Sequence, residues 1–293
     1  MDKRCDLHTH SCFSDGTFTP SQLLDEADAL GLSAIALCDH NTVEGLPEFL
    51  EAARYHRTET IPGAEFSTDY EGTELHILGL FIRPAYFEEI TRRMEHMHRL
   101  KEQSNLALVE NLRRAGYDLN YDRLREKTVG HINRAHIAAE LTALGYTASI
   151  KEAFSMLLKP SRGYYQPPER IDAFEMIRYI RSIGAVPVLA HPFLNLKEEG
   201  ALRRFLAPAK EAGLQGMEVL YPKFDEEQTH LAGKLAEEFG LLPSGGSDFH
   251  GENKPDIRLG GGKGTLKVPL SFLDGLKMAA TGNVPCKAYE KIL

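Results

Sequence analysis

The stretch CDLHTHSCFSD, residues 5–15, begins with a short apolar run and ends in side chains that bind metal ions. Cys5 to Leu7 predicts a β-strand, and His8, His10 and Asp15 come where that strand ends. Residues i and i+2 of a strand point to the same side, so His8 and His10 are placed to grip one cation. A single His-x-His pair is a weak signal, and a metal site needs further ligands from more distant parts of the chain.

Short apolar runs alternate with helical patterns through most of the sequence, which predicts repeated β-α units. Strands are expected near residues 33–38, 60–65, 75–82, 185–190, 217–221 and 241–244, and helices near 20–30, 46–56, 201–212 and 225–239. Polar side chains stand at or beside the strand ends: Asp39-His40, Glu65, His76, His191, and Asp248 with His250. The carboxyl ends of the strands of a parallel α/β barrel share one rim, so folding should bring these groups together.

Nine side chains make up the expected cluster: His8, His10, Asp15, His40, Glu65, His76, His191, Asp248 and His250. Buried imidazoles and carboxylates need partners, and packing alone does not explain so many of them at successive strand ends. Mixed nitrogen and oxygen ligands suit manganese, iron or zinc better than calcium or magnesium alone. Two or three divalent ions are expected, with Mn²⁺ the first choice and a carboxylate bridging them.

The composition narrows the class of protein. The chain has 293 residues, a net charge of −8 and 42% apolar residues, which is ordinary for a globular protein. We expect no membrane helix, no signal peptide and no stable nucleic-acid partner. Cys5, Cys12, Cys38 and Cys286 are expected to be free thiols in a reducing cytoplasm. A cluster of divalent cations would still attract a small anionic substrate.

The middle of the chain departs from the β-α alternation. Residues 86–168 are charged and helical in pattern, with helices expected near 86–116, 133–145 and 150–158. We interpret them as an all-helical insertion, with residues 1–85 and 169–293 forming the barrel domain. His96 and His98 are expected to face solvent. The segment Gly260–Gly264 lacks the spacing of a P-loop and is interpreted as a flexible turn.

The motifs together resemble the polymerase and histidinol phosphatase (PHP) family of metal-dependent phosphoesterases. They are residues 6–11 (DLHTHS) with 14–16 (SDG), 39–42 (DHNT), 63–65 (GAE), 75–77 (LHI), 190–192 (AHP) and 246–250 (GSDFH). The resemblance implies a distorted (β/α)7 barrel with a two- or three-metal centre. It assigns His8, His10, Glu65 and Asp248 to the first ion, Asp15, His40 and His250 to the second, and His76 and His191 with bridging Glu65 to the third.

The insertion is expected to supply the substrate contacts. In the segment HINRAH, residues 131–136, Arg134 lies at a predicted helix N-terminus, where a guanidinium adds to an anion site. Arg162, within a segment of cations and aromatics at 159–165, and Lys223, just past a strand end, are further candidates. Asp15 and His136 are the candidate catalytic residues, with His136 either a general acid or a phosphate ligand.

The expected activity is hydrolysis of a small phosphorylated ribose. Family members with a helical insertion include enzymes acting on 5-phosphoribosyl 1,2-cyclic phosphate, which cleave both of its ester bonds, and on 3′,5′-nucleoside bisphosphates. We favour the first, because residues 159–167 (KPSRGYYQP) depart from the bisphosphatase pattern. Histidinol phosphatase, an exonuclease, and a non-enzymatic metal or phosphate sensor are the other hypotheses. The sequence does not indicate an oligomeric state.

Overall fold

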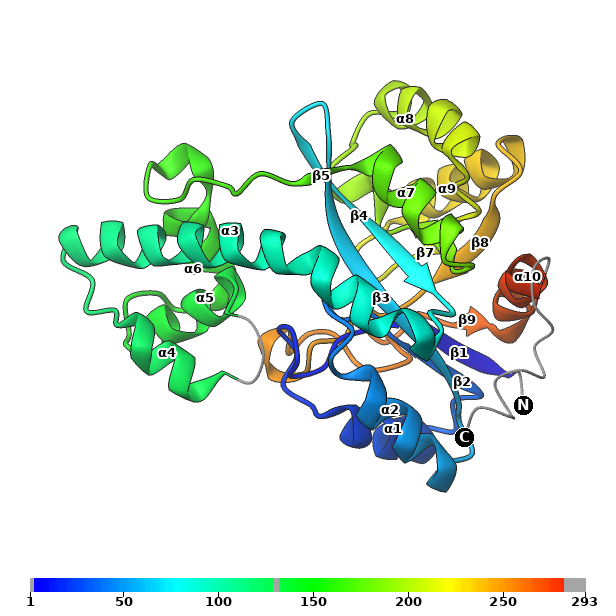
Figure 1. Ribbon diagram of the computed structural model, residues 1–293, viewed down its shortest axis with the longest axis horizontal. Coiled ribbons are helices and arrows are strands. Elements are labelled where there is room, and N and C mark those ends of the chain that lie inside the picture. The colour runs from blue at the N-terminus through cyan, green and yellow to red at the C-terminus, as the bar shows by residue number, and fades with distance from the viewer. Residues whose placement is uncertain (1–2, 129–131, 282–293) are drawn as a thin grey trace.

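The computed structural model describes residues 3–128 and 132–281 and shows a mixed α/β barrel (Figure 1). Seven strands follow one another around it in the order β8-β7-β6-β4-β3-β2-β1. They are β1 (Arg4–Thr9), β2 (Ala34–Leu37), β3 (Glu59–Tyr70), β4 (Thr73–Leu80), β6 (Val186–Leu189), β7 (Gly216–Leu220) and β8 (Leu242–Gly245). The short strands β5 (Ile171–Asp172) and β9 (Val268–Pro269) pair with β3 and β1. The predicted distorted barrel is confirmed.

The barrel closes between β1 and the segment that comes after β8. The Asp248 N–H donates to the His8 carbonyl at 2.8 Å, and the His10 N–H donates to the Phe249 carbonyl at 3.0 Å. The residues that close the barrel are therefore members or neighbours of the expected metal cluster, so closure fixes the relative position of ligands more than 230 positions apart in sequence.

Strands β3 and β4, expected with no helix between them, form an antiparallel hairpin, which departs from the parallel strands of a regular β-α alternation. Glu71 and Gly72 make its two-residue turn with φ of 51° and 78°, as tight hairpins of this kind require. Because β4 runs against its neighbours, its beginning lies at the rim where the parallel strands end. His76, near the start of β4, thereby reaches the same rim as the other ligands.

Within the described residues, ten α-helices surround the barrel or extend from it: α1 (Pro20–Ala29), α2 (Leu46–Ala52), α3 (Phe87–Arg114), α4 (Tyr121–Lys127), α5 (Arg134–Ala143), α6 (Ile150–Ala153), α7 (Ala173–Ser182), α8 (Glu199–Ala212), α9 (Glu226–Glu238) and α10 (Leu270–Thr281). Of these, α4, α7 and α10 are additional to the helices expected from the sequence. None of the described helices is both long and apolar enough to cross a membrane.

Helix α3 joins the barrel to the insertion and belongs to two cores. Ile90 and Met94 in its first half pack in the main barrel core, whereas Leu108 and Leu112 in its second half pack in a separate core with residues of α4, α5 and α6. Figure 1 shows α3 running from the barrel to the far end of the insertion. A helix anchored at both ends holds the insertion at a fixed place beside the rim. The domain boundaries at 85/86 and 168/169 remain an interpretation.

Two buried carboxylates hold the loops at the rim. Asp39 accepts hydrogen bonds from the Ser11 N–H and from the hydroxyls of Ser11 and Ser14 at 2.6–2.8 Å. Asp6 accepts from the backbone N–H groups of Ser247 and Gly260, both at 2.8 Å. The glycine-rich segment 260–264 is thus tied down as a turn.

Three of the four cysteines lie within the described residues. Cys5 and Cys38 are buried, Cys12 is half-buried, and all three are free thiols, as expected. Cys286 lies outside the described residues, as does residue 131 of the predicted phosphate-binding segment.

Gly246 sits where the barrel closes, and its replacement by alanine is expected to destabilise the fold. A Cβ at this position would lie 2.4 Å from the Cβ of His8 and 2.5 Å from its backbone nitrogen. Urea unfolding of Gly246→Ala should show a loss of about 1–3 kcal/mol, as overpacked cores do.

Gly233 provides the matched control, because a Cβ there meets nothing within 4 Å in the middle of α9. Gly233→Ala should be neutral or gain up to about 1 kcal/mol from helix propensity. Equal unfolding free energies for the two variants would contradict the close approach at Gly246.

Candidate metal centre and anion cavity

Glu65 lies at the centre of the nine predicted ligands, which the structure brings together at one rim of the barrel. Its side chain is fully buried on β3 and faces five imidazoles. Oε2 lies 3.2 Å from His8 Nε2, 3.3 Å from His10 Nε2 and 3.1 Å from His40 Nδ1, and Oε1 lies 2.7 Å from His76 Nδ1 and 2.9 Å from His191 Nε2. A carboxylate reached by histidines from both oxygens is placed to bridge two cations.

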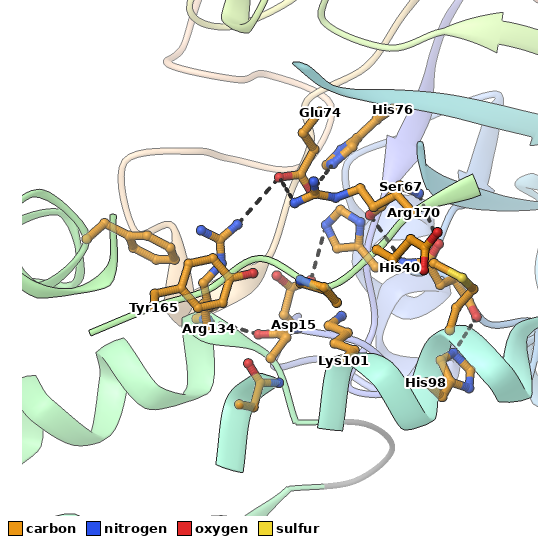
Figure 2. Close-up of a pocket in the computed structure, with 18 residues that line it drawn as sticks. Asp15, His40, Ser67, Glu74, His76, His98, Lys101, Arg134, Tyr165 and Arg170 are labelled. Carbon is orange, nitrogen blue, oxygen red and sulfur yellow. Dashed lines mark hydrogen bonds and ion pairs between the residues drawn. The ribbon is translucent and has the colours of Figure 1, made fainter. Parts of the chain in front are cut away.

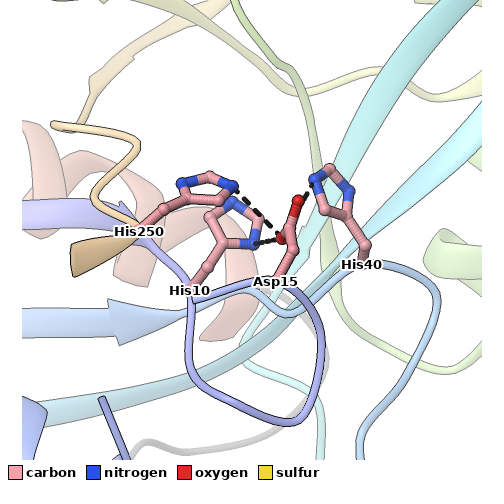
Figure 3. A group of neighbouring side chains, drawn as sticks. All are labelled: His10, Asp15, His40 and His250. Atoms are coloured by element: carbon pink, nitrogen blue, oxygen red, sulfur yellow. Dashed lines mark ion pairs between the residues drawn. The ribbon is translucent and has the colours of Figure 1, made fainter. Parts of the chain in front are cut away.

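The other two carboxylates stand on either side of His10. Asp15 Oδ1 lies 3.2 Å from His250 Nε2, 3.7 Å from His40 Nε2 and 3.9 Å from His10 Nδ1 (Figure 3). Asp248 Oδ1 lies 3.3 Å from His10 Nε2 and 3.8 Å from His8 Nε2. His10 therefore presents one ring nitrogen toward each carboxylate.

Several ring nitrogens of this cluster have no hydrogen-bond partner although they are buried. They are His8 Nε2, both nitrogens of His10 and His40 Nδ1, and Glu65 Oε2 is likewise without a donor. Orphaned buried polar atoms are costly unless something else satisfies them. Cations between the rings and the carboxylates would do so, and four overlapping groups of three or four ligand atoms lie within 4.8 Å of one another. The donor set fits divalent metal ions.

The backbone at the rim is strained where two of these ligands sit. His191 has φ of 28° and Asp248 has φ of 55°, in the left-handed region that residues other than glycine rarely adopt. Such conformations persist only where the surroundings impose them, and they cluster at functional sites. The His191 N–H donates to Glu218 at 2.6 Å and the Asp248 N–H donates to His8, so hydrogen bonds hold both residues in place.

A cavity of about 140 Å³ opens between the metal cluster and the insertion (Figure 2). Asp15, His40 and His76 line it on the barrel side. Three cations, Arg134, Arg170 and Lys101, line it together with Glu74. The cavity thus joins expected metal ligands to a concentration of positive charge.

Arg134 lies in the cavity, as expected for a substrate-binding residue. Asn133 caps α5 with its side chain, which places Arg134 at the first helical position. The guanidinium packs on the ring of Tyr165 at 4.4 Å and lies 3.6 Å from Glu74 Oε2. This position fits the predicted anion contact.

His136 follows Ala135 on α5 but is not among the residues that line the cavity. Its Nδ1 accepts a hydrogen bond from the Asn133 N–H at 3.2 Å, which leaves the proton of the neutral ring on Nε2. Burial lowers the pKa of His136, and Asp15 opposes this shift. A neutral imidazole of this kind suits hydrogen-bond donation to a phosphate oxygen better than general acid catalysis.

Arg162 and Lys223 are not brought into the cavity. Arg162 is exposed and donates through Nε to the Ser155 carbonyl at 3.1 Å. Lys223 is exposed just past β7.

A third difference concerns His98, for which the sequence predicts exposure to solvent. It is half-buried, lines the cavity, and its Nε2 lies 2.7 Å from the Asn41 carbonyl, because helix α3 crosses the rim at this point. His96 is exposed, as expected.

A family model described as the PHP domain matches residues 6–161. The chain belongs to the PHP domain family. Among solved structures, a metal-dependent phosphoesterase from Bifidobacterium adolescentis superposes with a TM-score of 0.84 at 28% identity, covering 94% of this chain and 96% of that one. This PHP protein is a metal-dependent phosphoesterase and hence a phosphoric ester hydrolase, as the resemblance predicted.

Curated relatives that match this PHP protein over most of its length carry different names. A 5′-3′ exoribonuclease of Haemophilus influenzae is 32% identical over 85% of this chain and 91% of its own. A phosphoribosyl 1,2-cyclic phosphate 1,2-diphosphodiesterase of Eggerthella lenta is 30% identical over 84% and 94%. A 3′,5′-nucleoside bisphosphate phosphatase of Chromobacterium violaceum is 28% identical over 86% and 90%.

Glu218 on β7 is a contact of the PHP metal cluster that sequence reasoning missed. It is fully buried, and Oε1 lies 2.9 Å from His8 Nδ1 while Oε2 accepts from the His191 N–H. A carboxylate on Nδ1 fixes the tautomer, which would leave Nε2 available to a bound ion. A single glutamate within a predicted strand looks the same in the sequence whether its side chain is buried or exposed, so the sequence did not single out Glu218.

Asp248 is held by two further residues that the sequence did not indicate. Its Oδ2 accepts from the Tyr221 hydroxyl at 2.8 Å and pairs with Lys254 Nζ at 2.7 Å. Burial, together with Asp248, raises the pKa of Tyr221 well above its usual value, so the hydroxyl keeps its proton. Both contacts leave Oδ1 turned toward the histidines.

Replacing Glu218 by glutamine should weaken metal binding. Only one atom of the amide accepts hydrogen bonds, so either His8 Nδ1 or the His191 N–H loses its acceptor. We expect Mn²⁺ affinity, measured by competition with a fluorescent chelator, to fall about 10- to 100-fold, as other changes to such partners do. Glu227→Gln, on the exposed first turn of α9, is the control and should bind like the wild type. Unchanged affinity in Glu218→Gln would contradict the assigned role.

Metal affinity should rise with pH. In the ion-free protein burial lowers the pKa of His10 and of His76, but the facing carboxylates outweigh burial and raise them to about 9 and about 10. Ion binding through these rings must displace protons below those values. Calorimetric titration with Mn²⁺ should therefore show affinity increasing about tenfold per pH unit for each proton released between pH 6 and 8. Affinity independent of pH would show that these rings are not ligands.

Proposed function

We propose that this protein hydrolyses a small phosphorylated ribose that carries a second phosphate, with 5-phosphoribosyl 1,2-cyclic phosphate as the best candidate. In this proposal the cyclic ester is opened and the same phosphate is then released. One observation carries it: Arg134, Arg170 and Lys101 line the cavity that also contains Asp15, His40 and His76. A substrate with one phosphate at the metals and another at the cations spans this arrangement.

Lys101 is the clearest candidate for contacting a phosphate of the substrate. It makes no hydrogen bond or ion pair with any residue in the described ranges, although it lines the cavity on α3 (Figure 2). Burial lowers the pKa of Lys101, and Asp15 and Glu74 oppose that shift. A partly buried, unpaired ammonium group is costly, and a phosphate beside it would remove the cost.

The aromatic rings of the cavity favour a substrate without a nucleobase. Tyr165 is 7% exposed and packs on Arg134, and Phe154 faces the same guanidinium at 5.8 Å. Neither ring is free as a stacking platform, which is how proteins commonly hold a base. This supports the sugar phosphate over a 3′,5′-nucleoside bisphosphate, the alternative substrate, which would release its 3′-phosphate.

The nine rim residues would hold two or three divalent ions in the sets that the family resemblance assigns. Mn²⁺ is our first choice, with Fe²⁺ or Zn²⁺ as alternatives. The ions supply water activation and charge stabilisation at phosphorus when bound. Arg134, Arg170 and Lys101 orient the substrate through its second phosphate, and His136 donates from Nε2 to an oxygen. The free thiols favour a reducing compartment, the cytoplasm.

A second candidate is stepwise removal of nucleotides from short RNA. Lys254 contacts Asp248 outside the cavity, and Lys223 comes after β7 next to Pro222, on which Gly262 packs. Partial desolvation of its ammonium group lowers the pKa of Lys223, and so do the nearby positive charges of Lys254, Lys263 and Lys151. Such lysines could hold the phosphates of a longer chain, and relatives named exoribonuclease agree with this. The net charge of −8 favours the small substrate.

The substrate proposal is tested by phosphate release from Mn²⁺-loaded enzyme. We expect the highest kcat/KM on 5-phosphoribosyl 1,2-cyclic phosphate, lower values on adenosine 3′,5′-bisphosphate and on a 5′-phosphorylated RNA trimer, and little on histidinol phosphate. Arg134→Ala should raise KM about 10- to 100-fold through loss of charge-assisted hydrogen bonds. A preference for the bisphosphate or the RNA would select the corresponding alternative, and an unchanged KM would remove Arg134 from the site.

A further inference from the structure

The carboxylate of Glu74 lies between the cations of the cavity and the metal cluster. Its Oε2 pairs with Arg170 at 2.7 Å and lies 3.6 Å from Arg134, while its Oε1 lies 3.5 Å from His76 Nε2 (Figure 2). Asn195 donates to the Glu74 carbonyl at 2.5 Å and fixes the backbone. One side chain therefore touches both halves of the site.

Glu74 occupies donors that a phosphate would use. A guanidinium binds carboxylate and phosphate with the same planar N–H groups, so the two anions compete for Arg170 and Arg134. A phosphate in the cavity would also be repelled by the Glu74 charge at close range. The carboxylate thus weakens anion binding while it holds both arginines in place.

The other oxygen of Glu74 orients a predicted metal ligand. His76 Nδ1 faces Glu65 at 2.7 Å, and Glu74 faces the opposite nitrogen. Acceptors on the remote nitrogen of a ligating histidine fix its tautomer and its orientation. Losing this acceptor leaves His76 free to turn away from Glu65.

We propose that Glu74 is a positioning residue that couples occupancy of the second-phosphate cavity to the alignment of His76, at the expense of anion affinity. This rests on the proposed function of the cavity. Phosphate binding at Arg134 and Arg170 weakens their hold on Glu74, which then pairs more closely with His76. The Glu74 carboxylate therefore lowers the affinity of the cavity for phosphate, and when the cavity is occupied it holds His76 in the correct orientation.

The coupling predicts opposite effects on binding and turnover in Glu74→Gln. Binding of ribose 5-phosphate to the metal-free full-length protein, measured by calorimetry, should tighten about threefold to tenfold as the repulsion disappears. In the Mn²⁺-loaded enzyme, kcat on the preferred substrate should fall at least about tenfold while KM falls or stays the same. A merely structural role would weaken both, and either weaker or unchanged ribose 5-phosphate binding or an unchanged kcat would overturn the proposal.

Two further variants make the test specific. Glu169→Gln removes one negative charge from the same cavity, but Glu169 makes no hydrogen bond or ion pair within the described ranges, so binding should change less than about twofold. Glu74→Asp keeps the charge and shortens the reach to His76, so kcat should fall without tighter binding, which also tests the proposal if Glu74→Gln folds poorly.

The wild type separates the two possible failures. If it does not bind ribose 5-phosphate, or binds it as Arg134→Ala does, the second-phosphate cavity is wrong and the proposed function fails with it. If it binds through Arg134 but Glu74→Gln binds no tighter, only the role of Glu74 is wrong.

Discussion

Everything at the rim depends on the buried carboxylate of Glu65 and the five imidazoles that face it. Burial alone raises the pKa of this carboxyl, but the surrounding histidines outweigh burial and hold it well below its usual range. A charge fully removed from water is tolerable only where opposite charges or hydrogen-bond donors surround it. The barrel meets this condition by ending several strands at one place. The segments that form the rim of the barrel therefore also carry the residues of the metal cluster.

Hydrogen bonds around that cluster hold the loops that carry the ligands. Asp6, Asp39 and Glu218 are buried acids that accept hydrogen bonds from backbone or side chains of the ligand loops. Their role is to hold loops whose backbone would not adopt this geometry unaided, as the positive φ of His191 and Asp248 shows. Because each of these acids accepts several hydrogen bonds, contacts within the protein itself hold the ligand loops in place.

The sequence predicts the metal ligands but not the residues that hold those ligands in place. His8, His10, Asp39-His40, His191 and Asp248 with His250 lie at or beside strand ends, and that placement is visible as a short-range pattern. Glu65 ends the strand expected at 60–65, although β3 continues past it to Tyr70. Glu218 and Glu74 lie inside strands, and Lys101 and His98 lie on a long charged helix. Their importance arises from contacts between distant segments, which one sequence does not encode locally. The antiparallel direction of β4 escapes prediction for a related reason, since a strand pattern carries no direction.

The predicted metal ligands and the cations of the cavity come from different parts of the fold. Every predicted metal ligand belongs to the barrel, whereas Arg134 and Lys101 come from helices of the insertion and Arg170 from the segment that returns to β5. Helix α3, anchored in both cores, fixes the distance between the two sets. Glu74 links the two sets, because it lies on β4 beside His76 and pairs with Arg170, so a change that moved the arginines would also act on the metal side of the site.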